Sequence, residues 1–119
     1  MRALPTNAPT NVAVIDERDP NAGGASHHYC VQWGGPKDVT RIGFQHGPRG
    51  DAKSTPGLFD DDILAILEDR LVCFQTGPFA CDENEQALNG IRHARFHLGH
   101  RVARRIAQGV LGERKEHKS

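Results

Sequence analysis

The sequence predicts an α+β fold in which a small antiparallel β-sheet is followed by a long antiparallel two-helix hairpin. Residues 25–45 alternate apolar and polar side chains with the two-residue period of strands. Residues 58–75 and 82–109 instead repeat apolar side chains at three- and four-residue steps, which is typical of amphipathic helices. Because only a short connection joins these two helices, they must lie antiparallel to each other.

The predicted sheet is preceded by residues 1–24, which are rich in Pro, Asn and Asp and are expected to form a flexible arm with one short edge strand. In residues 25–33, apolar side chains such as Tyr29 and Val31 alternate with more polar ones, which indicates a strand with one buried face. A glycine-containing turn follows, and residues 39–45 resume the alternation. These segments together predict an antiparallel β-hairpin.

The first predicted helix begins with three consecutive aspartates, where the helix macrodipole favours negative charge. Its predicted buried side consists of Ile63, Leu64, Leu67, Leu71 and Phe74. Asp82 is the predicted N-cap of the second helix, with Glu85 completing a capping box. The apolar side of that helix consists of Leu88, Ile91, Ala94, Leu98, Val102 and Ile106, and a basic stripe consists of His93, His97, Arg101 and Arg105. Residues 25–112 thus form the predicted domain, and residues 113–119 form a polar tail.

The composition narrows the functions that this chain can have. Its 119 residues suffice for one domain with a modest core. A formal net charge of zero argues against a protein that coats DNA, whereas the basic stripe favours a local anion site. Three cysteines without a C-x-x-C pair predict neither a disulfide framework nor a zinc knuckle, and they suit a reducing cytosol. No apolar run is long enough to span a bilayer, so no membrane association is expected.

Neither metal binding nor catalysis is predicted. His93 and His97 have the spacing of a metal-chelating pair, but Arg92 and Arg95 on the same helix would repel a cation. The sequence contains no nucleophile elbow, no cysteine with a companion base at a motif spacing and no glycine-rich phosphate loop. We therefore expect a protein that binds without turnover and carries no metal and no cofactor.

The strongest candidate site combines residues from both ends of the second helix. Phe74 and Gln75 end the first helix and Asn84 begins the second, whereas Arg101 lies about 25 Å further along the second helix and Arg105 lies about one turn beyond Arg101. An aromatic ring, an amide and two guanidinium groups are what a nucleotide requires of its binding site. One small ligand could contact all of them only if a second copy packs in the reverse direction, so the site is predicted to lie at a homodimer interface.

Each of these residues also has a simpler interpretation when it is considered alone. Phe74 could be a core residue beneath the turn, Asn84 an ordinary residue at a helix start, and the arginines a solvated surface. Two other functions remain open at this point. The basic helix could belong to a nucleic-acid-binding module, or the chain could be a structural oligomerisation protein without a ligand.

Several segments resemble a family of small phage proteins. They are GGASHHYCV, IGFQHGP, ILAILEDRLVCFQTGPFACDENEQAL and RRIAQGVLG. The chain from Gly23 to Gly112 is similar to the type-one Thoeris anti-defence proteins, which share a helical hairpin with phage sponges that act against cyclic-oligonucleotide (CBASS) immunity. A sponge is a protein that sequesters a signalling molecule without cleaving it.

The resemblance implies a sponge domain in residues 25–112 that forms homodimers or higher homo-oligomers in the host cytoplasm and binds no DNA or RNA. It implies sequestration of cyclic ADP-ribose isomers made by Thoeris TIR-domain enzymes and, in some members, of cyclic di- or trinucleotides. The resemblance assigns base stacking to Phe74, a polar contact to Asn84 and phosphate binding to Arg101 and Arg105. It also assigns an aromatic and an arginine contact from the sheet to Tyr29 and Arg41.

Overall fold

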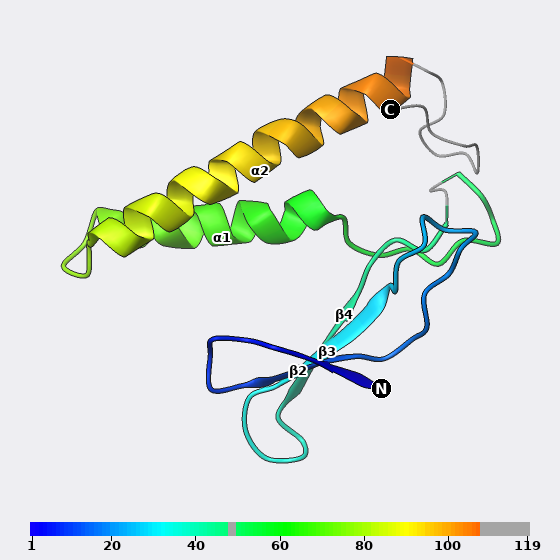
Figure 1. Ribbon diagram of the computed structural model, residues 1–119, viewed down its shortest axis with the longest axis horizontal. Coiled ribbons are helices and arrows are strands. Elements are labelled where there is room, and N and C mark those ends of the chain that lie inside the picture. The colour runs from blue at the N-terminus through cyan, green and yellow to red at the C-terminus, as the bar shows by residue number, and fades with distance from the viewer. Residues whose placement is uncertain (48–49, 108–119) are drawn as a thin grey trace. The chain divides into compact units, whose positions relative to one another are not determined.

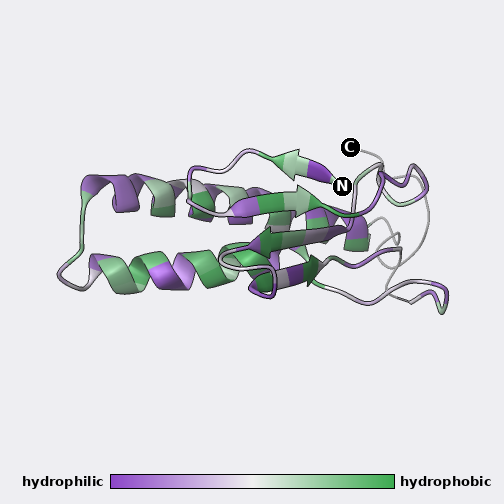
Figure 2. Cartoon of the chain, turned by 90° about the horizontal axis from the view of Figure 1, so that it is seen from below, coloured by the Kyte–Doolittle hydropathy of each residue, from purple (hydrophilic) through white to green (hydrophobic). Residues whose placement is uncertain are grey.

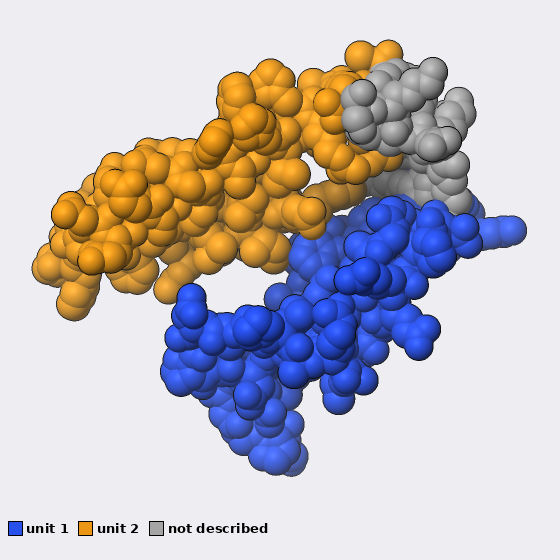
Figure 3. Space-filling view, viewed as in Figure 1, with its two compact units in different colours: residues 1–58, 112–114 blue, residues 59–111, 115–119 orange. Residues whose placement is uncertain are grey.

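The computed structural model describes residues 1–47 and 50–107, and these residues form two compact units (Figure 3). The first, here called the sheet unit, comprises the described residues up to Leu58. The second, here called the hairpin unit, comprises residues 59–107. Together they confirm the predicted α+β class, with an antiparallel sheet followed by a helical hairpin (Figure 1).

The sheet has four antiparallel strands in chain order, β1 to β4 (Figure 1). The strands are β1 (Arg2–Leu4), β2 (Asn11–Val14), β3 (His28–Gln32) and β4 (Val39–Gly43). Tyr29 of β3 lies opposite Val14 of β2 and Ile42 of β4, so these three side chains share one face of the sheet. Val14 is 2% exposed and lies at the centre of the small core that this face forms.

The N-terminal segment differs from the expected flexible arm, because it supplies two of the four strands. Arg2 lies opposite Val14, and Leu4 lies opposite Val12. β2 is consequently an inner strand and not the edge strand that its short apolar cluster indicated. A three-residue strand gives almost no periodic signal in a sequence, and β1 is therefore recognisable only by its pairing.

The segment after β4 returns to the sheet before the first helix begins. Leu58 donates its backbone N–H to the carbonyl of Gly43 at 2.9 Å, and its own carbonyl accepts the backbone N–H of Gln45 at 2.8 Å. Gly57 is required here, since a Cβ atom on it would lie 2.5 Å from the backbone carbonyl carbon of Phe44. The helix that was predicted from residue 58 thus begins two residues later, as α1 (Asp60–Gln75).

The two helices, α1 and α2 (Asp82–Ala107), run antiparallel. Near the turn Gln75 bonds to Glu85, and near the other end of α1 Asp61 bonds to Arg95. The predicted end of α2 at residue 109 and the predicted polar tail lie outside the described residues. The helix begins at the predicted residue, Asp82, but the carbonyl of Cys81 accepts the N–H of Glu85, so Asp82 is the first helical residue and not the predicted N-cap.

Arg95 connects the helices through two acidic residues of α1. Its Nε and Nη2 atoms donate to Asp61 at 2.8 and 3.1 Å, and its Nη1 atom donates to Glu68 at 3.0 Å. A bidentate guanidinium–carboxylate pair fixes both distance and orientation. Arg95 therefore faces α1. The apolar pattern had predicted that the neighbouring Ala94 would face α1, but Ala94 is exposed.

Acidification is expected to destabilise the hairpin unit through Asp61. The hydrogen bond from Arg95 lowers the pKa of the Asp61 carboxyl below its ordinary value, although desolvation opposes this effect. A carboxyl whose pKa is lowered by folding stabilises the fold above its unfolded pKa, and this contribution disappears as the pH falls through the folded pKa. The unfolding temperature of wild type should therefore drop between about pH 5 and about pH 2, and Asp61→Asn should remove part of that drop.

The control for this prediction is Asp69→Asn, which changes an exposed acid on the same helix. Thermal unfolding followed by circular dichroism across the pH series measures all three proteins. If Asp61→Asn and Asp69→Asn kept the same pH profile as wild type, the ion pair would have no role in the acid stability.

Much of the predicted apolar surface of the hairpin unit is exposed. Leu88 is buried, but no residue of α1 is. Leu67 and Phe74 of α1 and Ala94, Val102 and Ile106 of α2 were predicted to be buried, yet all five are exposed. Two helices have too little contact to cover their own apolar sides, and Figure 2 shows hydrophobic residues along both of them. Among the described helices, none is both long enough and apolar enough to cross a membrane.

Candidate functional site

The turn of the hairpin unit brings three of the predicted site residues into one region. Phe74 and Gln75 end α1, and Asn84 lies in the first turn of α2. The Phe74 ring is 39% exposed, and the guanidinium carbon of Arg70 lies 5.5 Å from its centre. Such a ring is available for stacking, and Arg70 places a positive charge beside it that the sequence pattern did not indicate.

The Gln75 amide already has a structural role at this turn. Its oxygen accepts the backbone N–H of Cys81 at 3.0 Å, while its nitrogen donates to the Cys81 carbonyl and to Glu85, both at 3.1 Å. These bonds hold the start of α2 against the end of α1. The Asn84 amide donates to the carbonyl of Phe79 at 3.3 Å, which leaves its oxygen for other donors.

The predicted arginines lie at the far end of α2 (Figure 1). Arg101 is exposed and Arg105 is half-buried. The helix is continuous from Asp82 to Ala107, so about 25 Å of helix separates Asn84 from Arg101. A single copy thus does not bring the ring and the amide together with the arginines. Their meeting across two copies stays a prediction.

The two predicted residues of the sheet unit do not form a pair. Tyr29 lies opposite Ile42, whereas Arg41 lies opposite Cys30, so the two side chains point to opposite faces of the sheet. The Tyr29 hydroxyl donates to the Ser26 carbonyl at 3.3 Å, and its ring meets the Phe44 ring edge-on. Arg41 is exposed. Their roles as ligand contacts remain predictions.

The histidines of the basic stripe contact one another along α2. The Nε2 atoms of His93 and His97 lie 3.0 Å apart, and the ring of Phe96 packs against His100 at 4.5 Å. Arg95, which was expected to repel a cation from His93 and His97, instead pairs with Asp61 and Glu68 of α1. The repulsion of a cation by Arg95 is therefore weaker than the sequence indicated.

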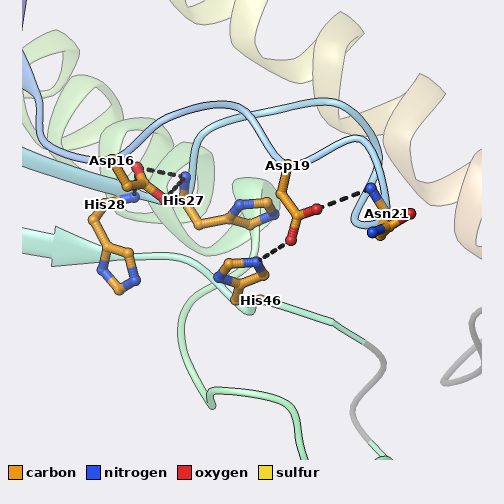
Figure 4. A network of polar contacts seen from close by, with 6 residues as sticks. All are labelled: Asp16, Asp19, Asn21, His27, His28 and His46. Carbon is orange, nitrogen blue, oxygen red and sulfur yellow. Dashed lines mark hydrogen bonds and ion pairs between the residues drawn. The ribbon is translucent and has the colours of Figure 1, made fainter.

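A cluster of histidines and aspartates in the sheet unit was missed by the sequence reasoning (Figure 4). It contains Asp16, Asp19, His27, His28 and His46. His27 and His28 are adjacent in the sequence, but their partners in this cluster come from distant parts of the chain. Because β2, β3 and β4 are antiparallel neighbours, the end of β2, the start of β3 and the end of β4 lie at the same end of the sheet. Knowledge of the strand order would have predicted this cluster.

Hydrogen bonds and burial determine which side chains of this cluster are charged at neutral pH. The pKa of the Asp16 carboxyl is subject to desolvation, which raises it, but the backbone N–H groups of His28 and His27 outweigh that effect and lower it. The hydrogen bond from His46 lowers the pKa of Asp19. Burial lowers the pKa of His27, which is 7% exposed. Both aspartates are thus anionic at neutral pH, and His27 is neutral.

Two comparisons with known proteins indicate the same kind of protein. The sequence model of the Acb2/Tad1 hairpin domain matches residues 36–103. The protein named Thoeris anti-defense 1 of Bacillus phage SBSphiJ7 is 31% identical over 114 residues, which is 89% of this chain and 79% of the relative. The family match covers α1 and α2 as far as residue 103, so it includes four predicted site residues of the helices (Phe74, Gln75, Asn84 and Arg101) and ends before Arg105.

Proposed function

The chain belongs to the Acb2/Tad1 hairpin-domain family and has a phage anti-defence role, and from this premise we propose that it sequesters a cyclic ADP-ribose signal without cleaving it. The family implies binding of small signalling molecules. Cyclic di- and trinucleotides of CBASS are the second class of signal that this site would take. Such a protein acts in the host cytoplasm, where these signals are made.

The side chains of the hairpin unit offer the chemistry that such a signal needs. Phe74 presents a half-exposed ring for stacking on adenine, and the free oxygen of Asn84 can accept a hydrogen bond from the base or the ribose. Arg101 and Arg105 present guanidinium groups, which bind phosphate oxygens through parallel hydrogen bonds. None of these groups is an activated nucleophile, which fits sequestration and not turnover.

The observation that carries the proposal is the separation of these groups along one straight helix. A cyclic ADP-ribose molecule is much shorter than the 25 Å or so between Asn84 and Arg101. Two hairpin units packed in opposite directions would place the arginines of one copy beside the ring and amide of the other. Such a homodimer has two identical sites because its interface is symmetric.

The exposed apolar side chains of the hairpin unit support the same arrangement. Ile66 is 58% exposed, Phe96 is 60% exposed and Ile106 is 61% exposed. Apolar surface that one copy leaves in water is a reason for a second copy to bind, since its burial is favourable by about 25 cal/mol per Å². A homodimer would cover part of this surface, and further association of dimers would cover more.

The direct test is to identify what the protein retains. Purified protein is incubated separately with cyclic ADP-ribose isomers and with cyclic di- and trinucleotides, freed of unbound ligand by gel filtration and then denatured by heat. We expect mass spectrometry to find an intact cyclic ADP-ribose isomer in the released material. A cleaved product would contradict sequestration, and an empty protein would contradict binding.

The same purified protein can be used to distinguish this proposal from the two other functions, which are nucleic-acid binding and oligomerisation without a ligand. A nucleic-acid-binding module would shift an oligonucleotide in a gel, with an affinity that falls steeply as salt increases. A structural oligomerisation protein would retain no nucleotide of any kind while still eluting as an oligomer. Either result would replace the proposed function.

A further inference from the structure

Three side chains at one end of strands β2, β3 and β4 have the chemistry and proximity of metal ligands. Asp16 follows β2, His28 begins β3 and His46 follows β4. Each offers one ligand atom, and these atoms all lie within 4.8 Å of one another. None of the three belongs to the proposed nucleotide site, so the cluster requires a separate explanation.

His46 is oriented as a metal-binding histidine usually is. Its Nε2 atom lies 2.7 Å from Oδ2 of Asp19, which is a charge-assisted hydrogen bond (Figure 4). A carboxylate oxygen accepts a hydrogen bond from a ring N–H, so this contact fits the tautomer with the proton on Nε2 and a lone pair on Nδ1. The ring of His27 stacks on that of His46 at 4.1 Å between centroids and 2° between planes, which fixes the plane of the ligand.

Asp16 is fixed just as firmly. Its Oδ1 atom accepts the backbone N–H groups of His27 at 3.1 Å and of His28 at 2.9 Å, and its Oδ2 atom accepts that of His27 at 3.0 Å. A carboxylate has about four lone-pair directions, so at least one remains for a cation. The chain therefore holds an anionic ligand in place through its own backbone.

His28 is the ligand that can adjust. Its side chain takes part in none of the hydrogen bonds of the cluster described above. Its Nδ1 atom lies 3.4 Å from where a Cβ atom on Gly43 would be, so the glycine leaves room for the ring. A tetrahedral ion with bonds of about 2.0 to 2.1 Å needs donor atoms about 3.4 Å apart. Because none of these hydrogen bonds holds the His28 side chain, its rotation can change the distance between its nitrogen and the other two donor atoms.

We propose that Asp16, His28 and His46 form a binding site for a divalent transition-metal ion, with zinc as the best match. Two imidazole nitrogens and one carboxylate oxygen are ligands that zinc accepts, and three protein ligands leave a fourth position for water or another small ligand. Asp19 and His27 act as the outer groups that orient His46.

The sheet unit would gain stability from such an ion. Among its described residues, Val14 is the hydrophobic side chain that is fully buried. Units of this size with so small a core commonly rely on a metal or on disulfides. An ion bound here joins the segments after β2, at the start of β3 and after β4, and it binds the folded state alone, so it stabilises folding by mass action.

The test uses the full-length protein, treated with EDTA and dialysed, and then melted with and without added zinc sulfate. We expect zinc at about a hundred times its Kd to raise Tm by roughly 10 °C. Cobalt(II), as a spectroscopic substitute, should bind with one ion per chain and give visible d–d absorption without a thiolate charge-transfer band, since no cysteine is a ligand.

Two variants locate the ion. His28→Gln removes a ligand but keeps the hydrogen bonds of Asp16 and Asp19, and it should lose the zinc-dependent rise in Tm. His93→Gln removes one member of the exposed histidine pair on α2 and should retain the rise. Circular dichroism of the metal-free proteins checks that His28→Gln still folds.

Three results would overturn the proposal. One is a wild-type Tm that zinc does not change. Another is a zinc response that persists in His28→Gln or disappears in His93→Gln. The third is a cobalt spectrum with a thiolate band, which would place a cysteine among the ligands. None of these results bears on nucleotide binding, so the two proposals can fail independently.

Discussion

Replacing Arg105 with alanine is expected to weaken binding of cyclic ADP-ribose by roughly ten- to more than a hundredfold. The reason is the loss of a guanidinium–phosphate interaction, since hydrogen bonds to charged groups contribute about 1.5 to 3 kcal/mol each. Arg105 lies near the end of the described part of α2 and is half-buried, so its position is partly fixed before a ligand arrives. Isothermal titration calorimetry with the purified isomer measures the change in Kd.

Arg104→Ala is the matched control for this experiment. Arg104 is the preceding residue of the same helix, it is exposed, and its removal changes the net charge by the same amount. We expect it to weaken binding only slightly, through the loss of a long-range attraction that added salt screens. Equal losses in both variants would indicate general electrostatic attraction, and an unchanged Kd in Arg105→Ala would remove Arg105 from the site.

Mixing two inactive variants is expected to restore binding. One variant carries Phe74→Ala and Asn84→Ala, and the other carries Arg101→Ala and Arg105→Ala. Each homodimer lacks half of both sites, whereas a mixed dimer combines the intact ring and amide of one copy with the intact arginines of the other. If subunits mix at random, about one quarter of the wild-type number of sites should return.

The separate variants are the controls, and each should bind weakly before mixing. The two proteins are unfolded and refolded together so that subunits exchange, and calorimetry then measures the number of sites with wild-type affinity. Size-exclusion chromatography confirms that both variants form dimers. If mixing restored nothing while mixed dimers formed, the residues would not meet across two copies, and a site within one copy would have to be sought.

The helical hairpin and the β3–β4 hairpin could be predicted from the sequence because their patterns are local. The alternation around Tyr29 and the three aspartates at the start of α1 each report on the residues next to them. Arg95 was misplaced because periodicity assigns the inner side of a helix to apolar residues, and here a charged side chain faces α1 to pair with Asp61 and Glu68.

Features that depend on distant segments could not be predicted in this way. The strand β1 has three residues and no periodic signal, and its place follows only from its pairing with β2. Asp16 and His46 lie close together because the pairing of β2 with β3 and of β3 with β4 places the ends of β2 and β4 side by side. The pairing of Gln75 with Cys81 likewise depends on the geometry of the turn. The proposed nucleotide site would require a second copy, and the pattern of one chain does not indicate how that copy is placed.

The unbroken course of α2 from Asp82 to Ala107 also limits how this hairpin can change in length. Inserting one residue between Asn84 and Arg101 would rotate both arginines by about 100° about the helix axis and move them by about 1.5 Å. Inserting seven would return them to within about 20° of their present direction but about 10 Å further from the turn. A longer or shorter hairpin that keeps both arginines on the same side of α2 as now must therefore differ from this one by nearly whole helical turns.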